Sequence, residues 1–97
     1  MQFILTAFDG TDASALERRI RCRPEHLEKI GHVKKAGKFL CGGAILDDDG
    51  RMIGSMILYE VSDRAELDRI LLDEPYINNK VWEKIDIRPF RMAKIDH

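Results

Sequence analysis

The chain has few cysteines, and the two that it contains lie far apart. Cys22 and Cys41 match no spacing of zinc ligands. We therefore expect two reduced thiols, no metal site and no cofactor held by cysteine.

Long hydrophobic runs are also missing, which excludes a chain inserted in a bilayer. The opening stretch "MQFILTAF" has no basic segment before its apolar residues and no small-residue cleavage site after them. It is typical of a β-strand rather than of a signal peptide. We expect a cytoplasmic protein without a membrane partner.

No excess of one charge is present, since 16 basic residues stand against 17 acidic ones. This balance argues against a nucleic-acid partner. One local cluster of basic residues has two interpretations, a solvated helix face beside glutamates or an anion-binding surface: Arg18, Arg19, Arg21 and Arg23.

The sequence also lacks GxGxxG, a Walker sequence, GxSxG and HExxH. Dinucleotide binding, nucleoside-triphosphate hydrolysis and the common hydrolase mechanisms therefore have no support.

Ninety-seven residues are enough for one domain with one modest core. Pro24 is expected to separate two helices, with Leu16, Ile20 and Leu27 on their buried sides. The Asp49-Gly50 pair predicts a hairpin. The pattern predicts strands at 2–8, 38–46, 51–61 and 81–92, and helices at 13–21, 24–36 and from 62 or 63 to Pro75.

This order predicts an α+β fold of the ferredoxin-like β-α-β-β-α-β type, an antiparallel sheet with helices on one face. The other face of the sheet would be open, and either set of alternating side chains in 52–59 is largely apolar. An apolar face on so small a chain favours a homodimer formed through the sheets.

His26 is the best candidate for proton transfer, because an imidazole donates or accepts protons near neutral pH. The alternative is a half-buried histidine that only packs in the helix. His32 and His97 are expected to face solvent. A histidine base benefits from a carboxylate that orients it, and Asp9 and the Asp73-Glu74 pair are the candidates.

Other residues offer hydrogen-bond donors to a ligand. Ser55 follows a glycine in a strand and can present a hydroxyl, or it is simply a small strand residue. Arg19 or Arg23 can bind a carboxylate with two parallel hydrogen bonds. The "CGGA" stretch indicates either a β-bulge or a close approach of backbone or ligand.

Several stretches in order resemble the YCII-related (YciI-like) family, small bacterial proteins of the dimeric α+β barrel group, and the resemblance covers 1–97 as one domain. These stretches are "FDG", "ALERRIRCRPEHL", "AGKFLCGGAILDDDG", "GSMILYEVSDRAE" and "DEPYINNKVWEKIDIRPF". The resemblance implies a dimer formed through the sheets, a cleft with a paired histidine and aspartate, and no cofactor. Most of the family's chemistry is unassigned, with a dehydrochlorinase among the members given an activity.

Carried over by position, His26 in "RPEHL" matches the family histidine. The family's "DPY" segment reads here Asp73-Glu74-Pro75-Tyr76, which leaves open whether Asp73, Glu74 or Asp9 is the partner. We predict His26 and Asp73 as catalytic residues. The expected substrate-binding residues are Asp9, Arg19, Arg23, Ser55, Glu74 and Tyr76.

The favoured function is a lyase of the dehydrochlorinase type, or an isomerase, acting on a small organic acid or phenol. One alternative is a non-catalytic module that binds a small ligand in the same cleft. Another is a structural protein whose open sheet docks on a partner.

Overall fold

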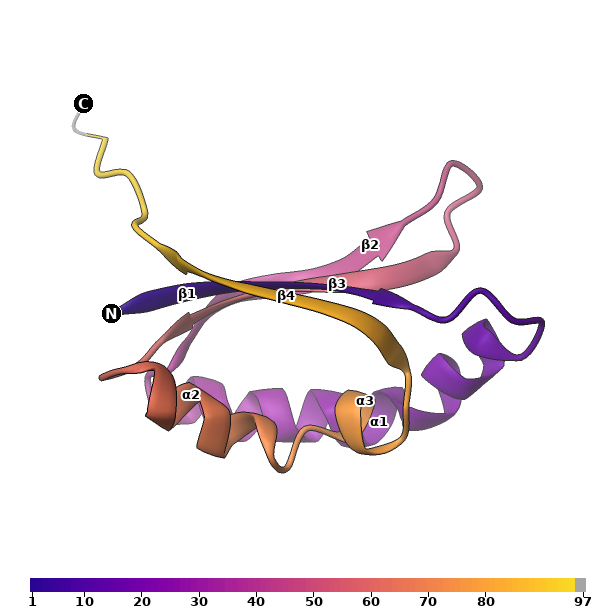
Figure 1. Cartoon of the computed structure of the whole chain (residues 1–97), viewed down its shortest axis with the longest axis horizontal. Helices are drawn as coiled ribbons and strands as arrows, with labels where there is room; N and C mark the ends of the chain where they lie inside the picture. The colour runs from indigo at the N-terminus through magenta and orange to yellow at the C-terminus, as the bar shows by residue number, and fades with distance from the viewer. Residues whose placement is uncertain (96–97) are drawn as a thin grey trace.

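The computed structural model describes residues 1–95 and has two layers, a curved sheet and a layer of helices (Figure 1). The elements are β1 (Gln2–Asp9), α1 (Ala15–Lys35), β2 (Phe39–Leu46), β3 (Met52–Glu60), α2 (Arg64–Leu71), α3 (Pro75–Asn78) and β4 (Trp82–Phe90). The four strands are antiparallel in the order β2-β3-β1-β4. The predicted ferredoxin-like architecture is confirmed.

Alternation of side chains places the core on one face of the sheet. Phe3, Leu5 and Ala7 of β1 are almost fully buried against the helices. Leu5 pairs in register with Ile57 of β3 and Ile87 of β4, which point to the same side. The sequence left open which alternating set of β3 is buried, and the structure selects the one that includes Ile57.

Helix α1 continues through Pro24 as one helix, so the predicted break was wrong. A proline inside a helix removes one backbone hydrogen bond and strains the preceding turn. Here the helix is held on both sides of that point, because Arg19 and His26 each bond to residues outside the helix. These tertiary contacts outweigh the local cost of the proline.

The buried side of α1 also differs from the expected one. Ile20 and Leu27 are exposed, at 54% and 48%. The inward stripe is instead formed by Ala15, Arg19, Cys22, His26 and Val33. Two of the inward positions are polar, which a pattern of apolar residues cannot reveal.

The helix expected from 62 to 75 is divided into α2 and α3. Asp63 caps α2 by accepting a hydrogen bond from the Glu66 amide at 2.9 Å, and Glu66 accepts one in return from the Ser62 amide. Pro75 does not end a helix but begins α3, with Glu74 as its N-cap. This short turn determines which acid faces the interior.

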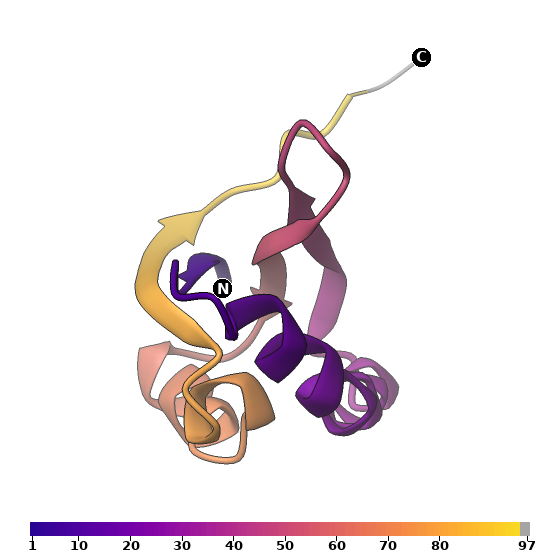
Figure 2. The ribbon, with the colours of Figure 1, turned by 90° about the vertical axis from the view of Figure 1, so that its right-hand side faces the viewer.

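All helices lie on one side of the sheet, as the end view shows (Figure 2). The other face is bare, and the β2–β3 hairpin and the C-terminal segment rise on either side of it (Figure 1). Ile4, Thr6 and Phe8 of β1 alternate with the buried core residues and therefore point to this open face. No helix within residues 1–95 is long and apolar enough to cross a membrane.

The two glycines of "CGGA" have different surroundings. A Cβ atom at Gly42 would lie 2.7 Å from the Met56 carbonyl oxygen, whereas one at Gly43 would meet no atom within 4 Å. The β2–β3 pairing is irregular between Phe39 and Cys41. Gly42 is thus required by the close approach of two strands at a bulge.

We predict that Gly42→Ala lowers the free energy of unfolding by about 1–3 kcal/mol, because the backbone must shift to relieve the overlap. Gly43→Ala serves as the matched control and should leave that free energy unchanged or slightly raised. Urea unfolding monitored by circular dichroism measures both. Equal losses in the two variants would contradict this account of the bulge.

Candidate functional site

A small cleft of about 120 Å³ lies between α1, the strands β2 and β3, and α3. Its polar lining consists of Arg19, Arg23, His26, Ser55 and Tyr76. Leucine, isoleucine, phenylalanine and the glycine-rich segment of β2 form the rest of the wall. The cleft therefore combines an apolar slot with a few converging polar groups, as ligand sites usually do.

Nδ1 of His26 lies 2.8 Å from Oε2 of Glu74, and both residues are buried. The same oxygen accepts a hydrogen bond from the Tyr76 amide at 3.0 Å. A carboxylate oxygen accepts hydrogen bonds, so Nδ1 is the donor to Glu74, and in the neutral imidazole the lone pair then lies on Nε2. Nε2 makes no hydrogen bond to any of residues 1–95.

Aromatic rings hold the imidazole in place. The His26 ring stacks on the Tyr76 ring with centroids 3.9 Å apart and planes 12° apart. Trp82 meets both rings edge-on, at 6.0 Å from His26 and 5.6 Å from Tyr76. Because Nδ1 is hydrogen-bonded to Glu74, the imidazole ring of His26 is held in one orientation.

Arg19 is the centre of a second buried network. Its Nη1 donates to both carboxylate oxygens of Asp9, at 2.8 and 3.1 Å, and its Nη2 donates to Ser55 Oγ at 2.7 Å. The guanidinium carbon lies 4.7 Å from the Tyr76 ring centroid, a cation–π contact. Ser55 Oγ also accepts from Trp82 Nε1 at 3.1 Å.

Burial affects the acidic groups around this network. Burial raises the pKa of Asp9, although the adjacent Arg19 guanidinium acts in the opposite direction. Burial likewise raises the pKa of Tyr76, against the effect of Arg19 and Arg23. The buried Tyr59 hydroxyl, which has no hydrogen-bond partner among residues 1–95, has its pKa raised by the same cause. Both tyrosines are therefore neutral at pH 7.

Most of the site residues predicted from the sequence lie together, with one correction. Asp73 is not the partner of His26, because its side chain is 82% exposed and approaches Lys29 at 3.9 Å instead. Glu74 occupies that place because it is the N-cap of α3 and turns inward. Asp9 pairs with Arg19 rather than with His26.

The remaining histidines lie apart from the cleft. His32 is exposed, as expected, and His97 is outside the described residues. Among residues 1–95 no group of three or more His, Cys, Asp or Glu side chains is arranged to hold a metal ion.

Trp82 is a site residue that the sequence did not predict. It belongs to the site because β4 pairs with β1 so that Trp82 lies opposite Asp9. No local motif marks this residue, and only the long-range strand register brings it to Ser55.

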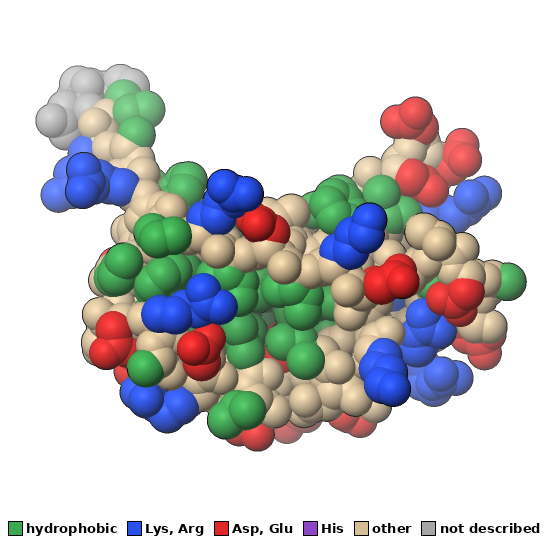
Figure 3. Space-filling model, viewed as in Figure 1, with side chains coloured by type: hydrophobic (Ala, Val, Ile, Leu, Met, Phe, Trp, Pro, Cys, Tyr) green, Lys and Arg blue, Asp and Glu red, His purple; other side chains and the backbone are tan. Residues whose placement is uncertain are grey.

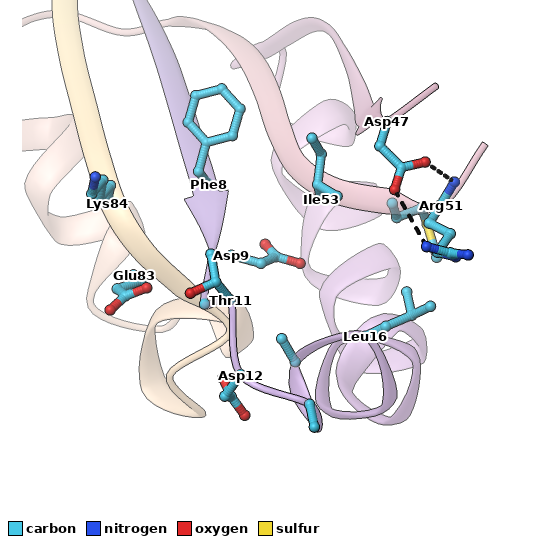
Figure 4. Close-up of a pocket in the computed structure, with 14 residues that line it drawn as sticks. Phe8, Asp9, Thr11, Asp12, Leu16, Asp47, Arg51, Ile53, Glu83 and Lys84 are labelled. Carbon is cyan, nitrogen blue, oxygen red and sulfur yellow. Dashed lines mark hydrogen bonds and ion pairs between the residues drawn. The ribbon is translucent and has the colours of Figure 1, made fainter. Parts of the chain in front are cut away.

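A larger hollow of about 850 Å³ lies between the end of β1, the β2–β3 hairpin and the start of α1 (Figure 4). Three of the acidic side chains that line this hollow form ion pairs with arginines, namely Asp9–Arg19, Asp12–Arg18 and Asp47–Arg51. It contains no histidine. The smaller cleft is therefore the better candidate site, because His26 in its lining can transfer a proton.

The model of the YCII-related domain family matches residues 1–91. The chain belongs to the YCII-related family. Protein YciI of Escherichia coli O6:H1 and that of Shigella flexneri are each 26% identical over 97 residues, covering 94% of this chain and 97% of theirs.

Solved structures share the fold of this chain. A 5-chloro-2-hydroxyhydroquinone dehydrochlorinase from Burkholderia phenoliruptrix, in complex with 2,5-dihydroxybenzoquinone, superposes with a TM-score of 0.83 at 22% identity, covering 96% of both chains. An antibiotic biosynthesis monooxygenase superposes at 0.56 with 16% identity, covering 96% of this chain and 98% of its own. Identities this low show the fold alone.

Removing Asp9 tests the buried ion pair. We predict that Asp9→Ala lowers the free energy of unfolding by about 3–5 kcal/mol, because the Arg19 guanidinium stays buried without its counter-charge. Asp68→Ala, which breaks the exposed pair with Arg64, should leave the unfolding midpoint nearly unchanged. Urea unfolding of both variants gives the comparison, and similar midpoints would contradict a buried pair.

Proposed function

We propose that this chain is a small enzyme in which His26, oriented by Glu74, transfers a proton to or from a one-ring phenol or small organic acid. The observation that carries the proposal is the 2.8 Å contact between Nδ1 and Glu74 Oε2, which leaves Nε2 free on the cleft side. A histidine held in this tautomer is suited to act as a general base.

The size and polarity of the cleft support the substrate class. A cavity of roughly 150 Å³ holds benzene, and the cleft has about 120 Å³. Arg23 places positive charge at its wall, which favours an oxyanion. The dehydrochlorinase with the same fold binds a dihydroxybenzoquinone, a ligand of this kind.

The reaction would need only the protein's own side chains. Nε2 takes a proton from an O–H or C–H group of the substrate, and the bonding electron pair remains on the substrate. Expulsion of a leaving group such as chloride gives an elimination. Return of the proton at another atom gives an isomerisation.

The test is turnover of 5-chloro-2-hydroxyhydroquinone, followed as chloride release, beside deuterium uptake from D₂O by a panel of phenols and organic acids. We predict that His26→Gln lowers the rate by about 10²–10⁴-fold, the usual contribution of a general base. Glu74→Gln should also lower it, because an amide no longer fixes the tautomer.

Asp73→Asn is the matched control, since the adjacent acid points to solvent, and it should keep the wild-type rate. Nitrogen-15 NMR of the imidazole is an independent readout: the Nδ1–H tautomer should dominate in wild type and Asp73→Asn and lose its preference in Glu74→Gln. Binding of panel compounds without turnover, unchanged by His26→Gln, would instead identify a ligand-binding module.

We further propose that two copies associate through the open sheet face. Thr6 of β1 and Met56 of β3 pair near the middle of this face, and Phe8, which is 43% exposed, extends the apolar surface. Hydrophobic side chains also gather between β4 and the helix layer, at the edge of the sheet (Figure 3). Covering the apolar sheet face removes it from water, which favours association.

Met56→Lys should weaken the dimer by about a hundredfold or more, because it buries two unpaired ammonium groups in the interface. Leu72→Lys adds the same charge at an exposed position of the helix layer and should leave association intact. Sedimentation equilibrium measures both dissociation constants. A wild-type protein that is monomeric at micromolar concentration would contradict the dimer.

A further inference from the structure

The hydroxyl group of Tyr59 on β3 is enclosed in the core. The residue is 0% exposed, and its Oη has no hydrogen-bond partner within residues 1–95. A polar group that is buried loses its hydrogen bonds to bulk water, so buried hydroxyls in native proteins nearly always have a partner, which is a protein group or an ordered water molecule. The Tyr59 hydroxyl therefore requires a partner.

The packing of the Tyr59 ring does not account for the hydroxyl. In the sheet register Tyr59 lies opposite Phe3 of β1 on one side and Phe39 of β2 on the other. Residues that pair across strands point to the same face, so the three rings form a row. A phenylalanine at position 59 would fill the same space without burying a polar group. The hydroxyl thus has a role other than packing.

A hydrogen-bond acceptor is unused on the carboxylate of Glu74. Its Oε2 accepts from His26 Nδ1 at 2.8 Å and from the Tyr76 amide at 3.0 Å, whereas its Oε1 accepts no hydrogen bond from residues 1–95. The Glu74 side chain is only 2% exposed. Each oxygen of an ionised carboxylate can accept about two hydrogen bonds, and a buried carboxylate is stable only when these are made. Oε1 therefore requires a donor.

The unused donor and the unused acceptor lie in the same region. Burial raises the pKa of the Tyr59 hydroxyl, and the negative charge of Glu74 raises it further. An electrostatic effect of this kind weakens with distance, so the hydroxyl lies in the neighbourhood of the carboxylate. The two groups do not bond directly, because Tyr59 Oη has no partner within residues 1–95.

We propose that one buried water molecule joins the two groups, accepting a hydrogen bond from Tyr59 Oη and donating one to Glu74 Oε1. Buried waters in proteins typically bind to polar groups that have no other partner. A water-mediated bond is nearly as favourable in enthalpy as a direct one. Tyr59 is then a positioning residue, which acts on His26 through the water and Glu74.

The water would hold the second oxygen of the Glu74 carboxylate. Oε2 is bonded to His26 and to the Tyr76 amide. With Oε1 bonded to the water, the carboxylate cannot turn without breaking a hydrogen bond, and it keeps the imidazole in one tautomer. The inference rests on the proposed function only for the use of this pair in proton transfer, because the water and its bonds do not require turnover.

A high-resolution crystal structure of the wild-type protein tests the water directly. The expected result is a water oxygen about 2.5–3.0 Å from both Tyr59 Oη and Glu74 Oε1. A structure without a water in this position would overturn the proposal. A structure in which Oη bonds directly to a protein group would overturn it as well.

Urea unfolding tests the hydrogen bond of the hydroxyl. Tyr59→Phe keeps the ring and should raise the unfolding equilibrium constant about two- to tenfold, the effect of losing one hydrogen bond. In a Glu74→Ala background the water has lost its acceptor, so the same substitution should change that constant less than about twofold. A hydroxyl without any partner predicts the opposite sign, because phenylalanine would then stabilise the protein. An unchanged or lower constant in the wild-type background would therefore overturn the proposal.

Hydrogen exchange of the His26 Nδ1 proton, followed by NMR, tests the positioning role. Tyr59→Phe should speed this exchange about two- to tenfold, because Glu74 is then held by one hydrogen bond fewer. Phe3→Leu is the matched control, since it changes the same row of rings without removing a hydroxyl, and its exchange rate should stay within about twofold of wild type. Equal acceleration in the two variants would overturn the positioning role.

The two proposals can fail separately. None of these three measurements uses a substrate, so a protein that turns over no panel compound would still show the water and the effect of Tyr59→Phe. A missing water, in contrast, would overturn the role of Tyr59 and leave the role of His26 to be decided by the turnover assay.

Discussion

The buried guanidinium of Arg19 is the constraint on which the rest of the site depends. A charge removed from water is costly unless it is paired and hydrogen-bonded. The two terminal nitrogens of Arg19 bond to Asp9 on β1 and Ser55 on β3, and the guanidinium lies over the ring of Tyr76 on α3, whereas Nε has no partner within residues 1–95. One side chain of α1 therefore fixes three other elements around the cleft, and its strict geometry makes their relative positions specific.

Two networks of different character share Tyr76. On one side Arg19 contacts its ring as a cation, and on the other the His26 imidazole stacks on it. Asp9 largely balances the charge of Arg19, so the network does not present a bare positive charge. Glu74 in turn stabilises any charge that His26 acquires. The cleft can thus hold opposite charges at separate places, while the sum of these charges stays close to zero.

The sequence was informative where local physics decides the structure. Alternating strands and the Asp49-Gly50 turn, where Gly50 has a φ of +83°, predicted the sheet correctly. It failed where distant contacts decide: the helix continues through Pro24 because residues on both sides of it are anchored elsewhere. The choice between Asp73 and Glu74 was equally open, because both acids lie in the turn between α2 and α3, and the start of α3 at Pro75 decides that Glu74 turns inward.

The inward stripe of α1 shows why functional residues were harder to place than core residues. Apolar periodicity identifies buried positions only when burial is driven by the hydrophobic effect, and at Arg19 and His26 it is not. An apolar side chain at position 19 would need no polar partner itself, but it would leave Asp9 without one. The same change at position 26 would leave Glu74 without its partner. A helix that places the polar side chains of Arg19 and His26 inward, two turns apart, while Ile20 and Leu27 stay exposed, loses apolar packing in exchange for a preorganised site. A local sequence pattern that disagrees with the observed burial is expected at positions where a functional requirement, rather than stability, determines which residue is present.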